Sequence, residues 1–371
     1  MPYPPDYGGA IDVFYKIKAL SALGIRIKLH CFEYGNRRQE SAAVALGEYC
    51  EQVHYYPRLT GGRGLWGLYP YIVASRRSDL LLKNLLEDEA PIFFEGLHSC
   101  FYLPHPQLKK RLKLVRVHNI EADYYQQLCI NEPMGWRKLY FAVEQWLLRR
   151  YAHVLRAANY LLPIALPDAA YLEKYFEKVV YLPAFHGNTL EDVAALSSET
   201  GNFALYHGNL QVSENRLAAL FLAEKVFAQL DYPLVIAGKM ASNDAILLNE
   251  NKKPITNSNL HITANPDYET LQKLFHSAQI HVLPAFQTTG IKLKLINSLY
   301  NGRHCLANEA MVNGTGLEAL CHIANTPEEF RQKIKDLSAL PFDVGLATQR
   351  QLFLKQNFDD ISNAQKIIDL L

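Results

Sequence analysis

Two lysines mark the stretch of the sequence with the clearest chemical potential. Lys292 and Lys294 follow a turn that ends at Gly290, and they begin an apolar-periodic segment that Gly302 closes. A strand, a glycine turn and a helix N-terminus direct free backbone N–H groups toward an anion. A cation in the first helical turn opposes the helix dipole, and a bound anion removes that cost. The stretch predicts a phosphate-binding site, and a βα unit with two solvated lysines is the open alternative.

Polar residues also follow two predicted strands in the first half of the chain. Glu95 closes an apolar run and His98 lies just beyond it, while His118 and Asn119 follow the run KLVRV. The carboxyl ends of parallel strands meet at one edge of a sheet, where open α/β proteins bind ligands. We therefore expect these residues at one sheet edge, although each of them alone is also compatible with a structural role.

The elements that must position these residues alternate between short apolar strands and amphipathic helices. A chain of 371 residues has room for two domains of roughly 100–200 residues each. Strands are predicted over 26–32, 52–56, 91–96, 113–117, 159–167, 203–210, 233–239, 261–263, 280–284 and 304–308. This alternation predicts an α/β fold with two doubly wound domains that face a cleft.

Two predicted helices of the first half carry specific expectations. A helix before Gly24 is predicted to bury an apolar face made of Ile11, Phe14, Ile17, Leu20 and Leu23. The segment 66–87 is predicted to be helical, after a glycine-rich loop over 59–67 that we interpret as a surface loop, with a lid over an acceptor as the alternative.

Composition indicates a soluble globular protein. Hydrophobic residues make up 49% of the chain and charged residues 20%, and the net charge of +1 gives no case for a nucleic-acid partner. The six cysteines lack metal-binding spacing and are predicted to be buried free thiols. The sequence shows neither a signal-peptide pattern nor an apolar run near the ~20 residues of a spanning helix. We expect a cytoplasmic protein, with membrane association as an open possibility.

The segment 134–155 is predicted to be a long amphipathic helix. Its apolar stripe includes Trp136, Leu139, Val143 and Trp146, and arginines and lysines flank it. Such a helix fits an anionic membrane surface, but it also fits a domain core with a solvated basic face. The basic region 109–156 would suit a lipid-phosphate acceptor at the inner membrane surface.

The stretch 284–302 resembles the donor site of family 4 of the glycosyltransferases, which have the GT-B fold. Members carry the pattern P-S-x-x-E-G-F-G-L-P-x-x-E-A-x-A-x-G. Aligned back from Gly302, this chain has Thr289 and Asn297 where the family has its two glutamates. The run GIKLKL (290–295) is more similar to a subgroup with G-x-x-K-L-x-E-A.

Other segments resemble the same family. RVHNIEADYY (116–125) is similar to its H-N-x-E segment, whose histidine lines the cleft near the acceptor, and VVYLPAFHGN (179–188) is similar to its interdomain linker. The family places a strand before the glycines that correspond to Gly8 and Gly9. This sequence lacks that strand, so we expect either that the natural start lies upstream or that another segment fills the gap, since open strand edges are normally avoided.

The resemblance implies two Rossmann-like domains of the GT-B fold. Residues 1–182 would form the acceptor domain, onto which 358–371 crosses back, and 183–357 the donor domain. The implied activity is transfer of a sugar from a nucleotide-sugar to a glycan or lipid-linked acceptor, with retention of the anomeric configuration. Because the sequence contains no D-x-D, we expect the reaction to need no metal.

His118 and Lys294 are the implied catalytic residues. Glu95, His98, His118 and Asn119 are placed on the acceptor side. The implied donor-binding residues are Gly8, Gly9, Gly208, Asn209, Lys239, Thr289, Gly290, Ile291, Lys292, Leu293, Lys294 and Asn297.

The loss of both motif glutamates keeps two other functions open. One is a non-catalytic GT-B module that binds sugar nucleotides. The other is a different GT-B enzyme, such as a nucleotide-sugar epimerase, which would need acid/base carboxylates in the cleft; Glu95 is the candidate for that role.

Overall fold

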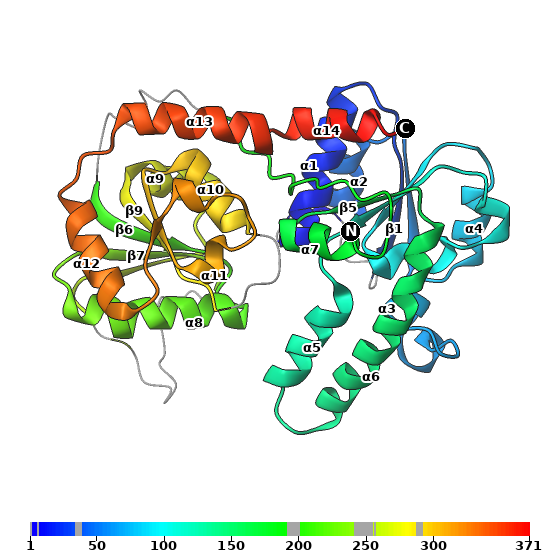
Figure 1. The fold of residues 1–371 in the computed structure, drawn as a ribbon, viewed down its shortest axis with the longest axis horizontal. Coiled ribbons are helices and arrows are strands. Elements are labelled where there is room, and N and C mark those ends of the chain that lie inside the picture. The colour runs from blue at the N-terminus through cyan, green and yellow to red at the C-terminus, as the bar shows by residue number, and fades with distance from the viewer. Residues whose placement is uncertain are drawn as a thin grey trace. The chain divides into compact units, whose positions relative to one another are not determined.

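The fold is described by a computed structural model that covers residues 2–5, 7–33, 39–190, 201–240, 255, 257–286 and 292–371. The chain forms two compact units (Figure 1). The first consists mainly of Met1–Phe185 and Phe358–Leu371, and the second of His186–Thr288 and Lys292–Asn357. Each unit is an α/β structure built on parallel strands, as the sequence predicts.

The second unit contains a six-stranded parallel sheet. Its strands lie in the order β11-β10-β9-β6-β7-β8, so the chain runs outward in one direction from β6 and then in the other direction from β9. The junction between β6 and β9 is the switch point at which doubly wound sheets bind ligands. The strands are β6 Gly201–His207, β7 Leu234–Gly238, β8 Leu260–Ala264, β9 Ala278–Leu283, β10 His304–Ala307 and β11 His322–Ile323.

Helices cover this sheet and complete its core. All six residues of β9 are buried, as expected for a central strand covered on both faces. Ile280, Val282 and Leu306 pack in one cluster with Phe330 of the helix α12. The helices are α8 Ser213–Phe221, η6 Leu222–Val226, η7 Phe227–Gln229, α9 Tyr268–Ser277, α10 Leu293–Asn301, α11 Glu309–Val312, η8 Glu318–Leu320, α12 Pro327–Ser338 and α13 Val344–Phe358.

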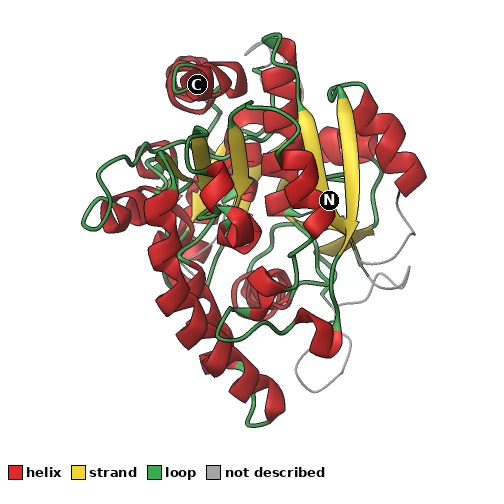
Figure 2. Cartoon of the chain, turned by 90° about the vertical axis from the view of Figure 1, so that its right-hand side faces the viewer, coloured by secondary structure: helices red, strands yellow, loops and turns green. Residues whose placement is uncertain are grey.

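The first unit holds two separate parallel sheets, which helices flank (Figure 2). One pairs β1 Lys28–Glu33 with β2 Gln52–Pro57. The other has the order β3-β4-β5, with β3 Ile92–Glu95, β4 Lys113–Val117 and β5 Tyr160–Pro163. Within the described residues, no strand joins the two sheets.

The helices of the first unit include one from the far end of the chain. α14 Asp360–Ile368 packs against α1 Gly8–Ala22, where Ala364 and Ile367 share a buried cluster with Ala19 and Leu114. The remaining helices are α2 Gln39–Gly47, η1 Gly61–Gly64, α3 Tyr71–Ala74, α4 Asp79–Leu85, η2 Leu97–Tyr102, η3 Pro106–Leu108, α5 Glu121–Asn131, α6 Trp136–Tyr151, η4 Ala152–Ala157 and α7 Leu166–Leu172.

Two expectations about the helices are wrong in detail. The segment 66–87 is two short helices, α3 and α4, because Pro70 stands at the start of the first and Ser78 caps the second by accepting a hydrogen bond from Leu81 N. The buried face of α1 includes the charged residues Asp12 and Lys16, which the apolar pattern did not indicate.

The six cysteines are free thiols, and Cys31, Cys50, Cys100 and Cys305 are buried. Burial raises the pKa of Cys31 to about 12 and that of Cys50 to about 11, so both stay protonated at neutral pH. In the part of the chain that the structure describes, no helix combines the length and apolar character that crossing a membrane requires.

Candidate functional site

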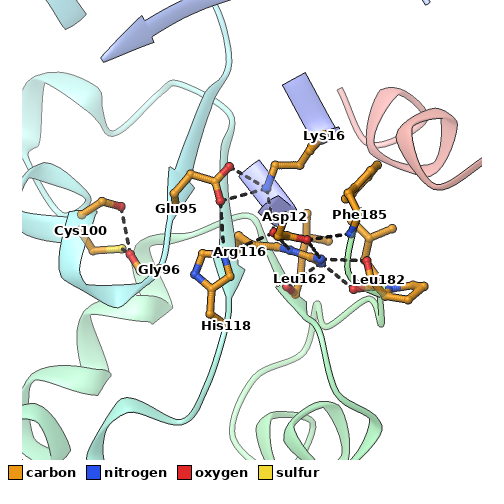
Figure 3. Close-up of polar contacts among 12 residues, drawn as sticks. Asp12, Lys16, Glu95, Gly96, Cys100, Arg116, His118, Leu162, Leu182 and Phe185 are labelled. Atoms are coloured by element: carbon orange, nitrogen blue, oxygen red, sulfur yellow. Dashed lines mark hydrogen bonds and ion pairs between the residues drawn. The ribbon is translucent and has the colours of Figure 1, made fainter. Parts of the chain in front are cut away.

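A buried ionic network centred on Asp12 occupies the first unit (Figure 3). Asp12, on α1, accepts hydrogen bonds from Arg116 Nη2 at 2.8 Å and Arg116 Nε at 3.1 Å, and from the backbone N–H of Phe185 at 2.9 Å. Arg116, on β4, also donates to the carbonyls of Leu182 and Pro183 at 2.6 and 2.8 Å. The pair therefore joins α1, β4 and the segment 182–185.

The charges in this network compensate one another. The side chains of Asp12 and Arg116 are both fully buried. Burial alone would raise the pKa of Asp12, but Arg116 and then Lys16 hold it well below its usual range. A buried pair of this kind is stable only when each charge keeps its partner and its remaining hydrogen bonds are made. This network could not be predicted from the sequence, because its members are far apart in the chain.

Two predicted acceptor-side residues contact this network. Glu95, at the end of β3, lies 2.7 Å from Lys16 Nζ, and Lys16 Nζ lies 3.4 Å from Asp12 Oδ2. His118 follows β4, and its Nε2 lies 3.3 Å from Asp12 Oδ2 and 3.6 Å from Glu95 Oε2. The structure thus brings Glu95 and His118 together at the carboxyl ends of adjacent strands.

His98 lies at the same edge. Gly96 and Leu97 separate it from Glu95. Gly96 has φ at +77°, and a Cβ built on it would lie 2.7 Å from the His98 ring and 3.3 Å from His118 Nδ1. The two imidazoles therefore flank one glycine, where no larger residue would fit. Burial lowers the pKa of His98 well below its usual range, so this ring is neutral at physiological pH. Asn119, next to His118, is half-buried.

Glu121 begins α5 and was not among the predicted site residues. Burial raises the pKa of its carboxyl to about 7, while His118 and Arg76 act in the opposite direction. A carboxyl that titrates near neutrality in a site is a candidate acid or base. The signal for it was present in the sequence, because Glu121 is the last residue of the H-N-x-E pattern.

Distances alone would let Asp12, Glu95 and His118 share a cation, since their ligand atoms lie within 4.8 Å of one another. However, Lys16 and Arg116 already occupy the carboxylate oxygens of this group. A divalent ion would have to displace two cations from the same site. We therefore assign no metal to the Asp12 network.

A different cluster lies at the switch point of the second unit. Lys294, near the start of α10, donates from Nζ to Tyr206 Oη at 2.9 Å and to Asn215 Oδ1 at 2.6 Å. Its ammonium also lies 4.7 Å from the centre of the Tyr206 ring. Gly208 follows β6, and a Cβ built on it would lie 2.7 Å from Lys294 Cε. β6, α8 and α10 thus hold one lysine beside a glycine turn.

The charge of Lys294 is compensated only by the Coulombic attraction of Glu214, which does not outweigh burial. Burial lowers its pKa to about 7, with Lys292 acting in the same direction and Glu214 in the opposite one. Burial also lowers the pKa of Lys292, which immediately precedes α10. No carboxylate forms an ion pair with Lys294 among the residues that the structure describes. Because a buried cation whose hydrogen-bond partners are neutral is unfavourable, a bound anion would stabilise it.

Two other predicted donor-side residues have polar contacts within the second unit. Asn209 Oδ1 accepts from the backbone N–H of Gln211 at 3.0 Å, which shapes the turn after β6. Asn297 Oδ1 accepts from Asn188 Nδ2 at 2.8 Å, and Asn301 Nδ2 donates to Asn188 Oδ1 at 2.9 Å. Asn297 is therefore already part of an amide network.

The remaining predicted donor-side residues are more scattered. Lys239 is exposed after β7, and Leu293 is buried, so a contact of Leu293 with a polar ligand would involve its backbone. Gly8 and Gly9 begin α1 in the first unit. Thr289, Gly290 and Ile291 lie outside the described residues.

Comparisons with known proteins place this geometry in a wider context. No protein-family model matches the sequence. An uncharacterised 44.6 kDa protein in the cps region of Klebsiella pneumoniae is 24% identical over 378 aligned positions, which cover 96% of this chain and 94% of that protein.

Solved structures resemble the whole chain at low sequence identity. A glycosyltransferase from Rickettsia africae superposes with a TM-score of 0.62 at 10% identity, covering 97% of this chain and 94% of that one. Arabidopsis thaliana UGT89C1, solved with UDP, superposes with a TM-score of 0.56 at 12% identity, covering 98% and 96%. Together with the two parallel-sheet units, these likenesses show that the chain has the GT-B fold. Membership of family 4 remains a prediction.

Proposed function

We propose that this protein is a glycosyltransferase that moves a sugar from a nucleotide-sugar donor to a glycan or lipid-linked acceptor in the cytoplasm. The observation that carries the proposal is the buried ammonium of Lys294, held by Tyr206 and Asn215 at the switch point of the second unit. A relative from a cps region supports a role in polysaccharide biosynthesis, and a UDP-bound structure of the same fold supports a nucleotide-sugar donor.

In this proposal the second unit binds the donor diphosphate. Lys294 and Lys292 supply positive charge where the departing nucleoside diphosphate becomes more negative, which is the charge that a transferase must stabilise. The N-terminus of α10 adds backbone N–H groups to the same site. We expect a metal-independent reaction, because the two lysines can supply the positive charge that a metal ion would otherwise provide. Asn297, which replaces a glutamate, would bind the ribose through the part of its amide that Asn188 does not use.

The first unit supplies the acceptor side. We place His118 against the reacting acceptor hydroxyl, with Glu95, His98 and Asn119 around it. Asp12 accepts a hydrogen bond from His118 Nε2, which fixes the ring and leaves Nδ1 directed toward Gly96. We expect retention of configuration, in which an oxygen of the donor phosphate takes the acceptor proton, so His118 positions the hydroxyl rather than removing its proton.

The first test is binding. A thermal-shift panel of nucleoside diphosphates and their sugars should identify at least one ligand that stabilises the wild type. Lys294→Ala should lose that stabilisation and reduce transfer by roughly 100-fold or more. It should fold normally, since the substitution removes a buried cation with a lowered pKa. Lys225→Ala, an exposed lysine of η6, is the matched control and should behave as wild type.

The outcome also separates the alternatives. If no nucleoside diphosphate binds the wild type at millimolar concentration, the proposal fails. Donor binding without hydrolysis or transfer would instead favour the non-catalytic module, a reading supported by the two missing motif glutamates. An epimerase that uses Glu95 is less well supported, because Glu95 is held in an ion pair with Lys16 and is a poor free base, so Glu121 would have to act as the acid or base.

A further inference from the structure

The helix α6 exposes an apolar stripe to solvent. Trp136, Leu139, Val143 and Trp146 are 78%, 67%, 48% and 51% exposed. At 3.6 residues per turn, these four positions fall within an arc of about 80° on one side of the helix. An amphipathic helix normally turns such a stripe toward the core. A contiguous exposed stripe of large apolar residues indicates an interaction surface.

The opposite face of α6 shows that the helix is firmly oriented. Glu144 is buried, and its carboxylate accepts hydrogen bonds from the backbone N–H groups of Tyr71 at 2.9 Å and Ile72 at 2.8 Å. Leu148 and Tyr151 are buried on the same side as Glu144. The sole acidic residue of α6 therefore points inward, and rotating the helix to hide the apolar stripe would expose this anchor.

The exposed charged residues of α6 itself are positive. Arg137, Arg149 and Arg150 are exposed, and the Arg150 guanidinium lies 5.0 Å from the centre of the Trp146 ring. Arg137 and Arg149 approach Glu132 and Asp123 at 3.2 and 3.8 Å, but exposed ion pairs of this kind are weak. Apolar side chains at the centre with arginines beside them match an interface of acyl chains and anionic headgroups.

The stripe also lies on a projecting element. α5 and α6 pack against each other as a hairpin that extends away from the sheets of the first unit (Figure 1). The turn between them carries Met134, which is 91% exposed, and Ile130 near the end of α5 is 59% exposed. A hairpin with an apolar side and an apolar turn can lie along a lipid surface while the sheets of the domain stay in water.

We propose that the α5–α6 hairpin docks the protein on an anionic membrane surface through the stripe Trp136, Leu139, Val143 and Trp146. The helix lies in the interface plane, because α6 has 16 residues and the described residues include no spanning helix. Arg149 and Arg150 contact the headgroups. This inference concerns a surface separate from the Lys294 cluster and does not depend on the proposed transferase activity.

The test uses the tryptophans of the protein as reporters. The chain has three tryptophans, Trp66, Trp136 and Trp146, and all three are exposed. Trp66→Phe leaves both reporters on α6. Vesicles containing phosphatidylglycerol should shift their emission to shorter wavelength and sediment with the protein, whereas vesicles of phosphatidylcholine alone should bind much more weakly. Trp136→Gln with Trp146→Gln should weaken sedimentation by roughly tenfold or more.

Separate variants test the charges and the location. Arg149→Gln and Arg150→Gln should each weaken binding to anionic vesicles by roughly fivefold, an effect that salt removes. Leu346→Gln with Leu352→Gln, two residues that are 57% and 56% exposed on α13, is the matched control and should bind as wild type. Lys294→Ala should also bind vesicles normally.

Three results would overturn the inference. One is a wild type that does not bind anionic vesicles. Another is binding that the paired tryptophan substitutions leave unchanged. The third is a wild type that self-associates in ultracentrifugation without binding vesicles, and that the same substitutions make monomeric, since the stripe would then join two copies of the chain.

Discussion

The two charged clusters of this protein are both buried, yet they are built in opposite ways. In the first unit, Asp12 is matched by Arg116 and Lys16, and the pKa of Asp12 falls well below its usual range. In the second unit, Lys294 has only hydroxyl, aromatic and amide partners, and burial lowers its pKa to about 7. One cluster is complete without a ligand, whereas the other is stabilised by adding an anion.

This difference separates a positioning role from a binding role. A compensated network fixes the elements that contribute to it, and here it fixes His118 beside Glu95. An uncompensated cation stores unfavourable energy that a phosphate can relieve on binding. Breaking the first cluster should therefore reduce stability, and changing the second should alter affinity. Three experiments follow from this contrast.

The largest effect is expected from Asp12→Asn. It leaves Arg116 buried without a counter-charge and should lower the free energy of unfolding by about 3–5 kcal/mol in denaturant titration. Glu328→Gln, which breaks an exposed pair with Arg331, should leave stability unchanged. The folded-state pKa of Asp12 is lowered, so its contribution is present above pH ~4 and is lost as the pH falls. A stable Asp12→Asn protein would show that the network is not compensated as described.

A smaller effect is expected from Gly208→Ala. The new methyl group would meet the end of Lys294, and the φ of +154° is unfavourable for alanine, so nucleoside diphosphate affinity should fall by roughly tenfold. Gly24→Ala is the matched control, because Gly24 has φ +83° but no atom near its Cβ position. Gly24→Ala should lower the stability of the protein but leave its nucleoside diphosphate affinity unchanged. Equal affinities in calorimetry for the two variants would remove Gly208 from the binding site.

The third experiment measures a pH dependence of donor affinity. Lys294 is charged below its pKa of about 7, and a bound diphosphate should raise that pKa toward its ordinary value. Binding above pH 7 must then take up a proton, so the association constant should fall about tenfold per pH unit. Lys294→Arg should flatten the profile, because arginine stays charged. Calorimetry from about pH 7 to 9 measures both, and a flat wild-type profile would contradict the lowered pKa.

The sequence predicted the strands better than the contacts between them. The apolar run 280–284 identified β9 because a central strand buried on both faces has no polar alternation. The glycine turn and the apolar-periodic segment after this run also predicted that Lys292 and Lys294 lie at the start of a helix, which is α10. The hydrogen-bond partners of Lys294 could not be predicted, since Tyr206 and Asn215 lie 88 and 79 residues away in the sequence.

Buried charged residues were also not predicted from the hydrophobic pattern. The helix α1 was predicted from its apolar residues, but Asp12 and Lys16 are among its most buried side chains. A periodicity argument assigns a charged residue to the solvent-exposed face. That Asp12 is buried becomes clear only from its partner Arg116 on β4. Arg116, within the strand KLVRV, was part of a correctly predicted strand, yet nothing local indicated that α1 would meet it.

The buried thiols described above make the two units separately observable. Cys31, Cys50 and Cys100 belong to the first unit and Cys305 to the second. A buried, protonated thiol reacts with an alkylating reagent only when its surroundings open. Mass spectrometry of cysteine peptides after timed alkylation would therefore report how often each half of the molecule opens under native conditions, without any engineered probe.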